Sequence, residues 1–260
     1  MSEVRYEVEG PVARLTIDRP ERRNAMSFPV MQGLRDGVAA AKADDRVRVL
    51  VLTGAGDRAF CSGADLGSGG IAGTEGHAAA HDGRGLIADL FRDLWALGKP
   101  TIARVRGYAL AGGFGLALAC DFVIAADDAQ FGTPEIDVGL WPYMITVPLL
   151  RSMPPKTVLE LMTTGRRVDA AEAERIGFVN RVVPVGELDE AVAELAAMLA
   201  GKSPLVMRWG RQAFYRVLQM PADDALDYLQ AMLTITSHSE DTAEGVAAFA
   251  EKRDPEWKGR

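Results

Sequence analysis

The chain has 260 residues, of which 48% are hydrophobic and 25% charged, and its formal net charge is −7 at pH 7. An acidic surface repels a phosphate backbone, so we expect no nucleic-acid partner. No apolar stretch approaches the about 20 residues that cross a bilayer, and the first residues contain no apolar signal core, so we expect no membrane contact and a cytoplasmic location. The two cysteines, Cys61 and Cys120, have no metal-ligand spacing, which favours a reducing compartment and predicts no metal site.

Strands and helices alternate over the first part of the chain. Ser27 can cap a helix, and the apolar run 47–52 is typical of a strand buried on both faces. The glycine-rich stretch 67–85 lacks periodicity and predicts a surface loop. We expect strands at 4–8, 12–17 and 47–52, and helices at 29–42 and 86–97.

The second part continues this alternation and then becomes helical. Strands are predicted at 101–105, 122–125, 130–132 and 178–183, and helices at 112–119, 145–151, 159–163 and 170–176. Four further helices are predicted at 188–200, 204–218, 221–236 and 240–252. The pattern indicates an α/β core over residues 1–186 and an all-helical region over 187–260.

Two glycine-rich turns follow strand-like runs, CSGADL at 61–66 and AGG at 111–113. Each turn can leave a backbone N–H free near a helix start, and two such groups aimed at one point form an oxyanion hole. The helix dipole would add to the stabilisation of negative charge. For either turn alone, an ordinary loop is the simpler interpretation. The spacing of the glycines matches neither the dinucleotide-binding nor the phosphate-loop pattern.

A third stretch, FGTPEIDVGL, places Glu135 directly after a proline. By itself this residue is compatible with a helix start or a surface carboxylate. The histidine pair His77 and His81 could share a helix face, but in a glycine-rich segment we interpret it as a solvated pair rather than as metal ligands.

These stretches, together with RPERRNAMS near the front and EGVAAFAEKRDPEW at the back, resemble the enoyl-CoA hydratase/isomerase (crotonase) superfamily over nearly the whole chain. The resemblance implies an α/β fold with a crotonase-type ββα superhelical spiral core and an all-helical C-terminal trimerisation region. It implies an acyl-CoA substrate, with no cofactor beyond the coenzyme A of the substrate, and a homotrimer or a hexamer formed as a dimer of trimers.

The resemblance also implies roles for individual residues. The backbone N–H groups of Ala64 and Gly112 match the pair that binds the thioester oxygen, and Glu135 matches an acid–base glutamate. Phe249 and Lys252 match positions that reach coenzyme A across a subunit contact. The positions expected to contact the substrate are Arg22, Ala25, Ser62, Asp65, Leu66, Phe249 and Lys252.

One position departs from the pattern of the family's hydratases, which carry a second glutamate three residues after the oxyanion-hole glycine. Gly115 stands there, so a single glutamate favours Δ3,Δ2-enoyl-CoA isomerisation. The alternatives are a hydratase in which Asp65 or Asp137 holds the water, another crotonase-type reaction such as thioester hydrolysis or dehalogenation, and a non-catalytic acyl-CoA-binding homologue. The stretch GLWPYMITVPLLR indicates either an unusual acyl-pocket wall or ordinary core.

Overall fold

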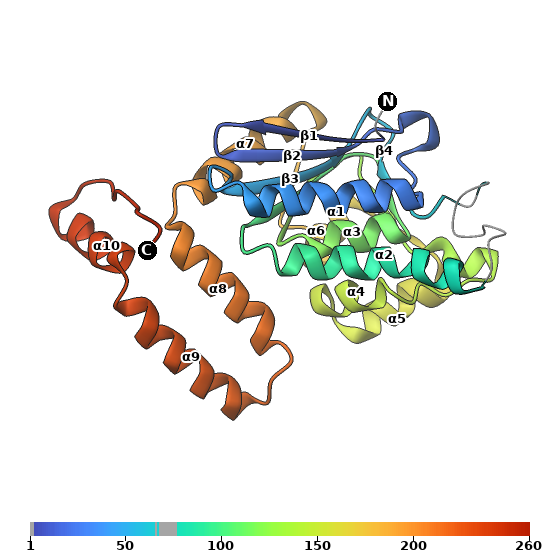
Figure 1. Ribbon diagram of the computed structural model, residues 1–260. Helices are drawn as coiled ribbons and strands as arrows, with labels where there is room; N and C mark the ends of the chain where they lie inside the picture. The colour runs from blue at the N-terminus through green and yellow to red at the C-terminus, as the bar shows by residue number, and fades with distance from the viewer. Residues whose placement is uncertain (1–2, 66, 68–76) are drawn as a thin grey trace.

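The computed structural model describes residues 3–65, 67 and 77–260 (Figure 1). Leu66, which we expect to contact the substrate, lies outside the described residues. So do residues 68–76 of the predicted loop 67–85. In the described part of the chain, no helix is long and apolar enough to cross a membrane.

The described residues contain ten strands, which form two sheets. The first sheet has the order β1-β2-β3-β5-β7-β10, with β1 Val4–Glu9, β2 Val12–Ile17, β3 Val49–Gly54, β5 Thr101–Val105, β7 Phe122–Ala126 and β10 Arg181–Val183. The second has the order β4-β6-β8-β9, with β4 Ala59–Cys61, β6 Tyr108–Leu110, β8 Gln130–Gly132 and β9 Arg167–Asp169. Strands β1 and β2 form an antiparallel hairpin.

The helices follow the strands in a spiral. The chain passes from β3 to β4 and then into α2, and it repeats this order from β5 through β6 into α3, as expected for a ββα spiral. Short 3-10 helices lie at Pro20–Arg22, Pro134–Val138 and Val185–Glu187. The α-helices are α1 Phe28–Ala43, α2 His77–Trp95, α3 Gly112–Ala119, α4 Thr146–Ser152, α5 Pro155–Thr164, α6 Ala170–Ile176, α7 Leu188–Ala200, α8 Pro204–Val217, α9 Ala222–Ser237 and α10 Glu240–Glu251.

Strand β3 is buried on both faces, as its continuous apolar sequence predicts. Successive side chains of a strand point to opposite faces. Leu50 and Leu52 therefore join the main core, while Val49 and Val51 join a second cluster with residues of α7. Helix α7 thus covers one face of the first sheet, although it belongs to the helical region of the sequence.

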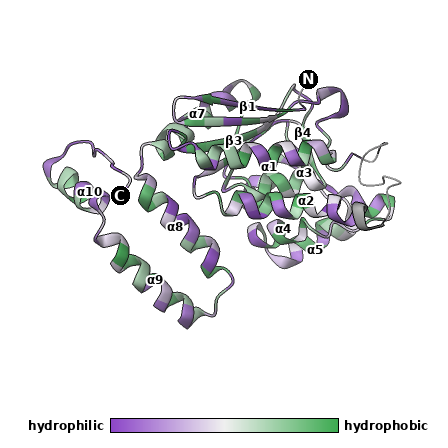
Figure 2. Ribbon diagram, in the orientation of Figure 1, coloured by the Kyte–Doolittle hydropathy of each residue, from purple (hydrophilic) through white to green (hydrophobic). Residues whose placement is uncertain are grey.

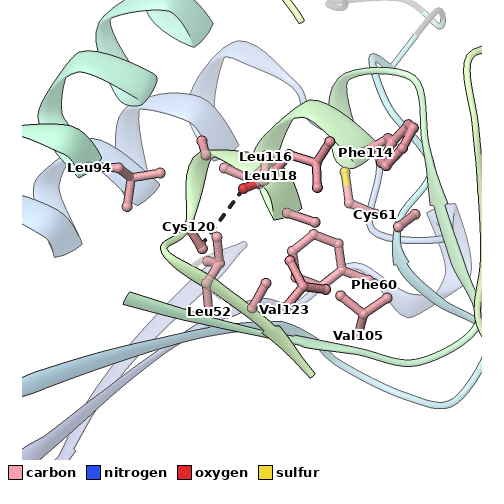
Figure 3. Packing of buried hydrophobic residues seen from close by; sticks show 14 of the residues in the cluster. Leu52, Phe60, Cys61, Leu94, Val105, Phe114, Leu116, Leu118, Cys120 and Val123 are labelled. Carbon is pink, nitrogen blue, oxygen red and sulfur yellow. Dashed lines mark hydrogen bonds between the residues drawn. The ribbon is translucent and has the colours of Figure 1, made fainter. Parts of the chain in front are cut away.

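Helix α3 is surrounded by the main core and is apolar along its whole length. Figure 3 shows Phe114 and Leu116 of this helix packed near Phe60 and Val123. Gly113 through Ala119 are buried. Because every face of α3 is packed, its N-terminus at Gly112 has a fixed position.

The predicted loop over 67–85 is wrong for residues 77–85, which form the first turns of α2. A Cβ built at Gly83 would lie 2.7 Å from Phe28 Cε1, so the ring of Phe28 packs directly against the bare backbone of this helix. The glycine that suggested a loop instead permits a close contact between α1 and α2.

The strand predicted over 178–183 forms only at Arg181–Val183. Just before it, the Asn180 side-chain oxygen accepts a hydrogen bond from the backbone N–H of Val123 at 2.7 Å. The backbone N–H of Asn180 in turn donates to the Val123 carbonyl at 2.9 Å. A side chain thus replaces one ladder bond, and the regular strand starts after it.

Helices α8 to α10 extend away from the core (Figure 1), and a buried arginine on α8 attaches them to it. Arg211 is 8% exposed and its Nε donates to Asp121 at 2.7 Å. Its terminal nitrogens donate to the carbonyls of Trp95 at 2.8 Å and Leu94 at 2.7 Å, at the end of α2. A cation at a helix C-terminus is favourable. The Tyr215 hydroxyl donates to the same aspartate at 2.6 Å.

We expect the substitution Arg211→Met to loosen this arm. Removing one partner of a buried ion pair costs about 3–5 kcal/mol, because the other charge stays buried without compensation. Thermal unfolding and limited proteolysis at 201–203 would measure the loss. Arg208→Met, an exposed position on the same helix, is the control and should change the melting temperature little. Equal melting temperatures for the two variants would contradict the role of Arg211.

Candidate functional site

Three neighbouring strands of the second sheet end at one edge, and each is followed by a residue of interest. Strands β4, β6 and β8 are parallel neighbours. Ala64 follows the end of β4, Gly112 the end of β6 and Glu135 the end of β8. The carboxyl ends of parallel strands meet at the same edge of a sheet, where ligands bind in many α/β proteins. The fold therefore brings these three residues to one edge.

A single parallel bridge orients the N–H of Ala64. Met26 donates its N–H to the Gly63 carbonyl at 2.8 Å and accepts from the N–H of Asp65 at 2.9 Å. In a parallel ladder the residue between two bonded neighbours points its own N–H to the other side. Among the described residues, the N–H of Ala64 has no hydrogen-bond acceptor.

The N–H of Gly112 opens helix α3. Before it, Ala111 has φ 52° and ψ −129°, a conformation that is rare for a residue with a side chain. Such strain costs about 1–3 kcal/mol and persists where the surroundings impose it. Within the part of the chain that the structure describes, no side chain caps α3. The first N–H groups of a helix lack intrahelical partners and carry the positive end of its dipole.

The two segments touch each other through glycines. A Cβ built at Gly63, where φ is +96°, would lie 2.6 Å from the Ala111 Cβ and 3.3 Å from the Gly112 nitrogen. A Cβ at Gly113 would overlap the carbonyl of Cys61. Only glycine allows this approach. The peptide group between Gly63 and Ala64 therefore lies close in space to the peptide group that carries the N–H of Gly112. Two N–H groups on neighbouring segments suit the binding of an oxyanion.

Glu135 lies in the 3-10 helix Pro134–Val138. Thr133, directly before this helix, is buried, and its hydroxyl donates to the Leu161 carbonyl at 2.9 Å. This hydrogen bond anchors the start of the helix. The Glu135 Oε2 atom is buried and has no hydrogen-bond partner in the described chain. Burial raises the pKa of this carboxyl from 4.5 to about 7, although its own backbone N–H opposes the shift. A carboxyl with such a pKa can accept and return a proton near neutral pH.

Arg19 organises the loop beside the two N–H groups, and it is not among the site residues that the sequence predicts. Its guanidinium contacts Asp65 at 3.0 Å and Glu3 at 2.8 Å, and donates to the Ala25 carbonyl at 2.8 Å. The N–H of Gly67 and then the Arg19 guanidinium hold the pKa of Asp65 below its usual range. Local sequence could not show this, because the paired residues are far apart in the chain.

Most of the predicted coenzyme A contacts gather near this loop. The N–H of Ser62 donates to the Arg23 carbonyl at 3.1 Å, so the segment around Arg22 and Ala25 lies beside the segment around Ser62 and Asp65. Two other predicted contacts are not brought to the site within the chain. Phe249, 88% exposed, and Lys252 lie at α10, far from the core helices in Figure 1. The described residues contain no group of three potential metal ligands.

A family model, curated relatives and solved structures each match almost the full length of the chain. The model of the family "Enoyl-CoA hydratase/isomerase" matches residues 7–260. The carnitinyl-CoA dehydratase of Salmonella heidelberg is 39% identical over 259 residues, covering 96% of each chain. A crystal structure of an enoyl-CoA hydratase from Mycobacterium smegmatis is 31% identical, with a TM-score of 0.93 and 98% of each chain covered. An enoyl-CoA hydratase structure from Bacillus anthracis, also 31% identical, has a TM-score of 0.92 over 99% of this chain and 100% of that one.

The raised pKa of Glu135 predicts a pH-dependent stability. Between pH 4.5 and about 7 the folded protein binds more protons than the unfolded chain, so stability falls as pH rises through this window and is flat above it. Glu135→Gln removes this titration. We expect its free energy of unfolding to rise relative to the native protein across the window, by at most about 3 kcal/mol. Urea unfolding of both proteins at pH 5 and pH 8 measures this rise. If the difference in free energy of unfolding between the two proteins is the same at pH 5 and pH 8, the burial of the charge is contradicted.

Proposed function

The chain belongs to the enoyl-CoA hydratase/isomerase family, and on that basis we propose that it isomerises an enoyl-CoA thioester from the Δ3 to the Δ2 form. Ala64 and Gly112 receive the thioester oxygen with their N–H groups, and Glu135 carries the proton. One observation supports this most strongly. Glu135 is half-buried and its carboxyl has a pKa of about 7; its Oε2 atom is buried without a partner in the described chain, and the residue lies at the same strand edge as the two N–H groups.

The proposed reaction uses one acid–base group twice. The Glu135 carboxylate removes a proton from C2 of the 3-enoyl thioester, and the electron pair of that C–H bond enters a conjugated dienolate. Its negative charge lies largely on the thioester oxygen, where each N–H donor contributes about 3–4 kcal/mol. Glu135 then returns the proton to C4, which moves the double bond from C3–C4 to C2–C3. The reaction is redox-neutral and balances without a cofactor.

The neighbouring carboxylates support a single-acid mechanism. Hydration requires a second group that holds water, and Gly115, one helical turn after Gly112, has no side chain. Asp65 is engaged by Arg19. Asp137 is exposed, and its Oδ2 atom lies 3.1 Å from where a Cβ would stand at Gly165. Neither aspartate is a free substitute for the second glutamate.

Hydration or dehydration of an acyl-CoA is the second candidate, because relatives at 39% identity bear the name carnitinyl-CoA dehydratase. It would require a second acid of an unusual kind. A non-catalytic acyl-CoA-binding role is the third. The unpaired, desolvated carboxyl of Glu135 speaks against it, since such a group costs stability and a binding module has no use for it.

We further propose a homotrimer, or a hexamer made of two trimers, because the helical arm exposes apolar side chains. Figure 2 shows hydrophobic residues along α8 and α9, which extend away from the core. Large exposed apolar patches mark interaction surfaces. The arm contributes Phe214, Leu226, Leu233, Ile235, Val246 and Phe249.

A cytoplasmic location is also proposed. Cys61 and Cys120 are both buried free thiols, which suits a reducing compartment. Desolvation raises the pKa of Cys61 to about 12, so this thiol stays protonated and unreactive at neutral pH.

An assay with two substrates tests the proposed reaction. We expect the protein to convert a 3-enoyl-CoA with a rise in the absorbance of the conjugated thioester, and to hydrate crotonyl-CoA slowly. Since the base must be ionised, kcat/KM should rise with pH to a plateau above about 7. Glu135→Gln should lower turnover about 10²–10⁴-fold without a large change in coenzyme A affinity. Fast hydration of crotonyl-CoA by the native protein would rule out isomerisation as the main activity.

The assembly and the distant coenzyme A contact are tested together. Sedimentation should give a mass of three or six times the 27.9 kDa chain. Lys252→Glu should weaken coenzyme A binding about threefold to tenfold, by loss of a charge pair with a phosphate. Lys42→Glu, at the exposed end of α1, is the matched control. A monomer at micromolar concentration would contradict the assembly, and equal affinities of the two variants would contradict the contact.

A further inference from the structure

One face of α3 carries both Gly112 and Gly115, which lie one turn apart. Residues three apart on a helix share a face. A Cβ built at Gly112 would lie 3.3 Å from Ile87 Cδ1 of α2. A Cβ built at Gly115 would lie 3.3 Å from Phe91 Cζ and 2.6 Å from the Cβ of Ile145, and it would overlap Ile145 Cγ2. No side chain fits at position 115 while Ile145 is in place.

Ile145 is held firmly where it contacts Gly115. It is 3% exposed and stands directly before α4. Its carbonyl accepts from the N–H of Leu149 at 3.1 Å. The next residue, Thr146, donates its hydroxyl to the Pro142 carbonyl at 2.9 Å. A β-branched side chain is also restricted at χ1, so Ile145 has little freedom to withdraw from α3.

We propose that Ile145 determines the type of reaction, an inference that rests on the proposed isomerisation. Its hydrocarbon side chain fills the volume beside Gly115 in which a second acid would stand. Together with Phe91 and Ile87 it forms an apolar wall along the face of α3 that begins at the N–H of Gly112. A bound water requires two to four polar partners, and these three side chains offer none.

This wall leaves the proton transfer intact and opposes hydration. Returning a proton to the dienolate needs only the carboxyl of Glu135 and the two N–H donors. Adding water to C3 needs a group that orients the water and accepts its proton. The stretch that contains Ile145 therefore acts as a wall that decides the reaction, and the pair Gly115 and Ile145 has to change together to restore hydration.

A thermal-stability cycle tests the steric part. Gly115→Ala should lower the melting temperature by roughly 5 °C, because the new methyl group overlaps Ile145. In an Ile145→Gly background, which removes both overlapping atoms, the same substitution should cost less than half as much. Ile145→Val is the matched control, since it keeps both overlapping atoms and should give no relief. Equal costs of Gly115→Ala in all three backgrounds would overturn the inference.

The catalytic part is tested with a glutamate. The double variant Gly115→Glu, Ile145→Gly should hydrate crotonyl-CoA at least about tenfold faster than the variant with Gly115→Gln and Ile145→Gly, which has the same shape without a carboxylate. Gly115→Glu alone should gain no hydration. Equal hydration by the two double variants would refute the catalytic role of the pair. If neither folds, the stability cycle decides.

The outcomes separate this inference from the proposed function. If the native protein hydrates crotonyl-CoA rapidly, the proposed isomerisation fails, whatever the stability cycle shows. If the native protein isomerises but Ile145→Gly gives Gly115→Ala no relief, the proposed function stands and the role of Ile145 fails.

Discussion

The parallel bridge between Met26 and Ala64 is the contact on which the site depends. Its two hydrogen bonds use the carbonyl of Gly63 and the N–H of Asp65. Because those neighbours are committed to Met26, the N–H of Ala64 must face away from Met26. Without the bridge, the chain after β4 would be a free turn, and its N–H groups would have no fixed direction. One short bridge thus fixes the orientation of one of the two N–H groups that we propose bind the thioester oxygen.

The carboxylates of low exposure differ in whether a positive charge compensates them. Asp121 and Asp65 are each bound by an arginine with low exposure, and each fixes one segment to another. Glu135 is half-buried, and its Oε2 atom is buried without a partner among the described residues. Desolvation without compensation raises the pKa of a carboxyl toward neutrality, where proton transfer in both directions is efficient. Low exposure thus accompanies ion pairs that join segments of the fold, and at this one group it raises the pKa to about 7, which is the property that our proposed function uses.

The helical region has two different relations to the core. Helix α7 packs on the first sheet as a normal core helix, whereas α8 to α10 form an arm that reaches outward (Figure 1). Arg211 and Tyr215 attach α8 to Asp121, which lies between α3 and β7. The direction of the arm is therefore set at the end of the helix whose N-terminus carries Gly112. Any partner bound by the arm would be positioned by the same element that positions the site.

The sequence by itself determined the order of the α-helices and of seven of the described strands, because apolar periodicity and capping residues such as Ser27 act locally. It did not indicate β4, β6 and β9, three short strands of the second sheet whose pairing only the tertiary structure decided. It also indicated Ala64, Gly112 and Glu135 through the resemblance of their motifs to a family. It misjudged residues 77–85, whose glycines permit packing against Phe28 rather than a loop. The tertiary structure alone decided the roles of Arg19 and Ile145. Both act on residues distant in the chain, and local patterns carry no information on which side chain will fill a given volume or neutralise a given charge.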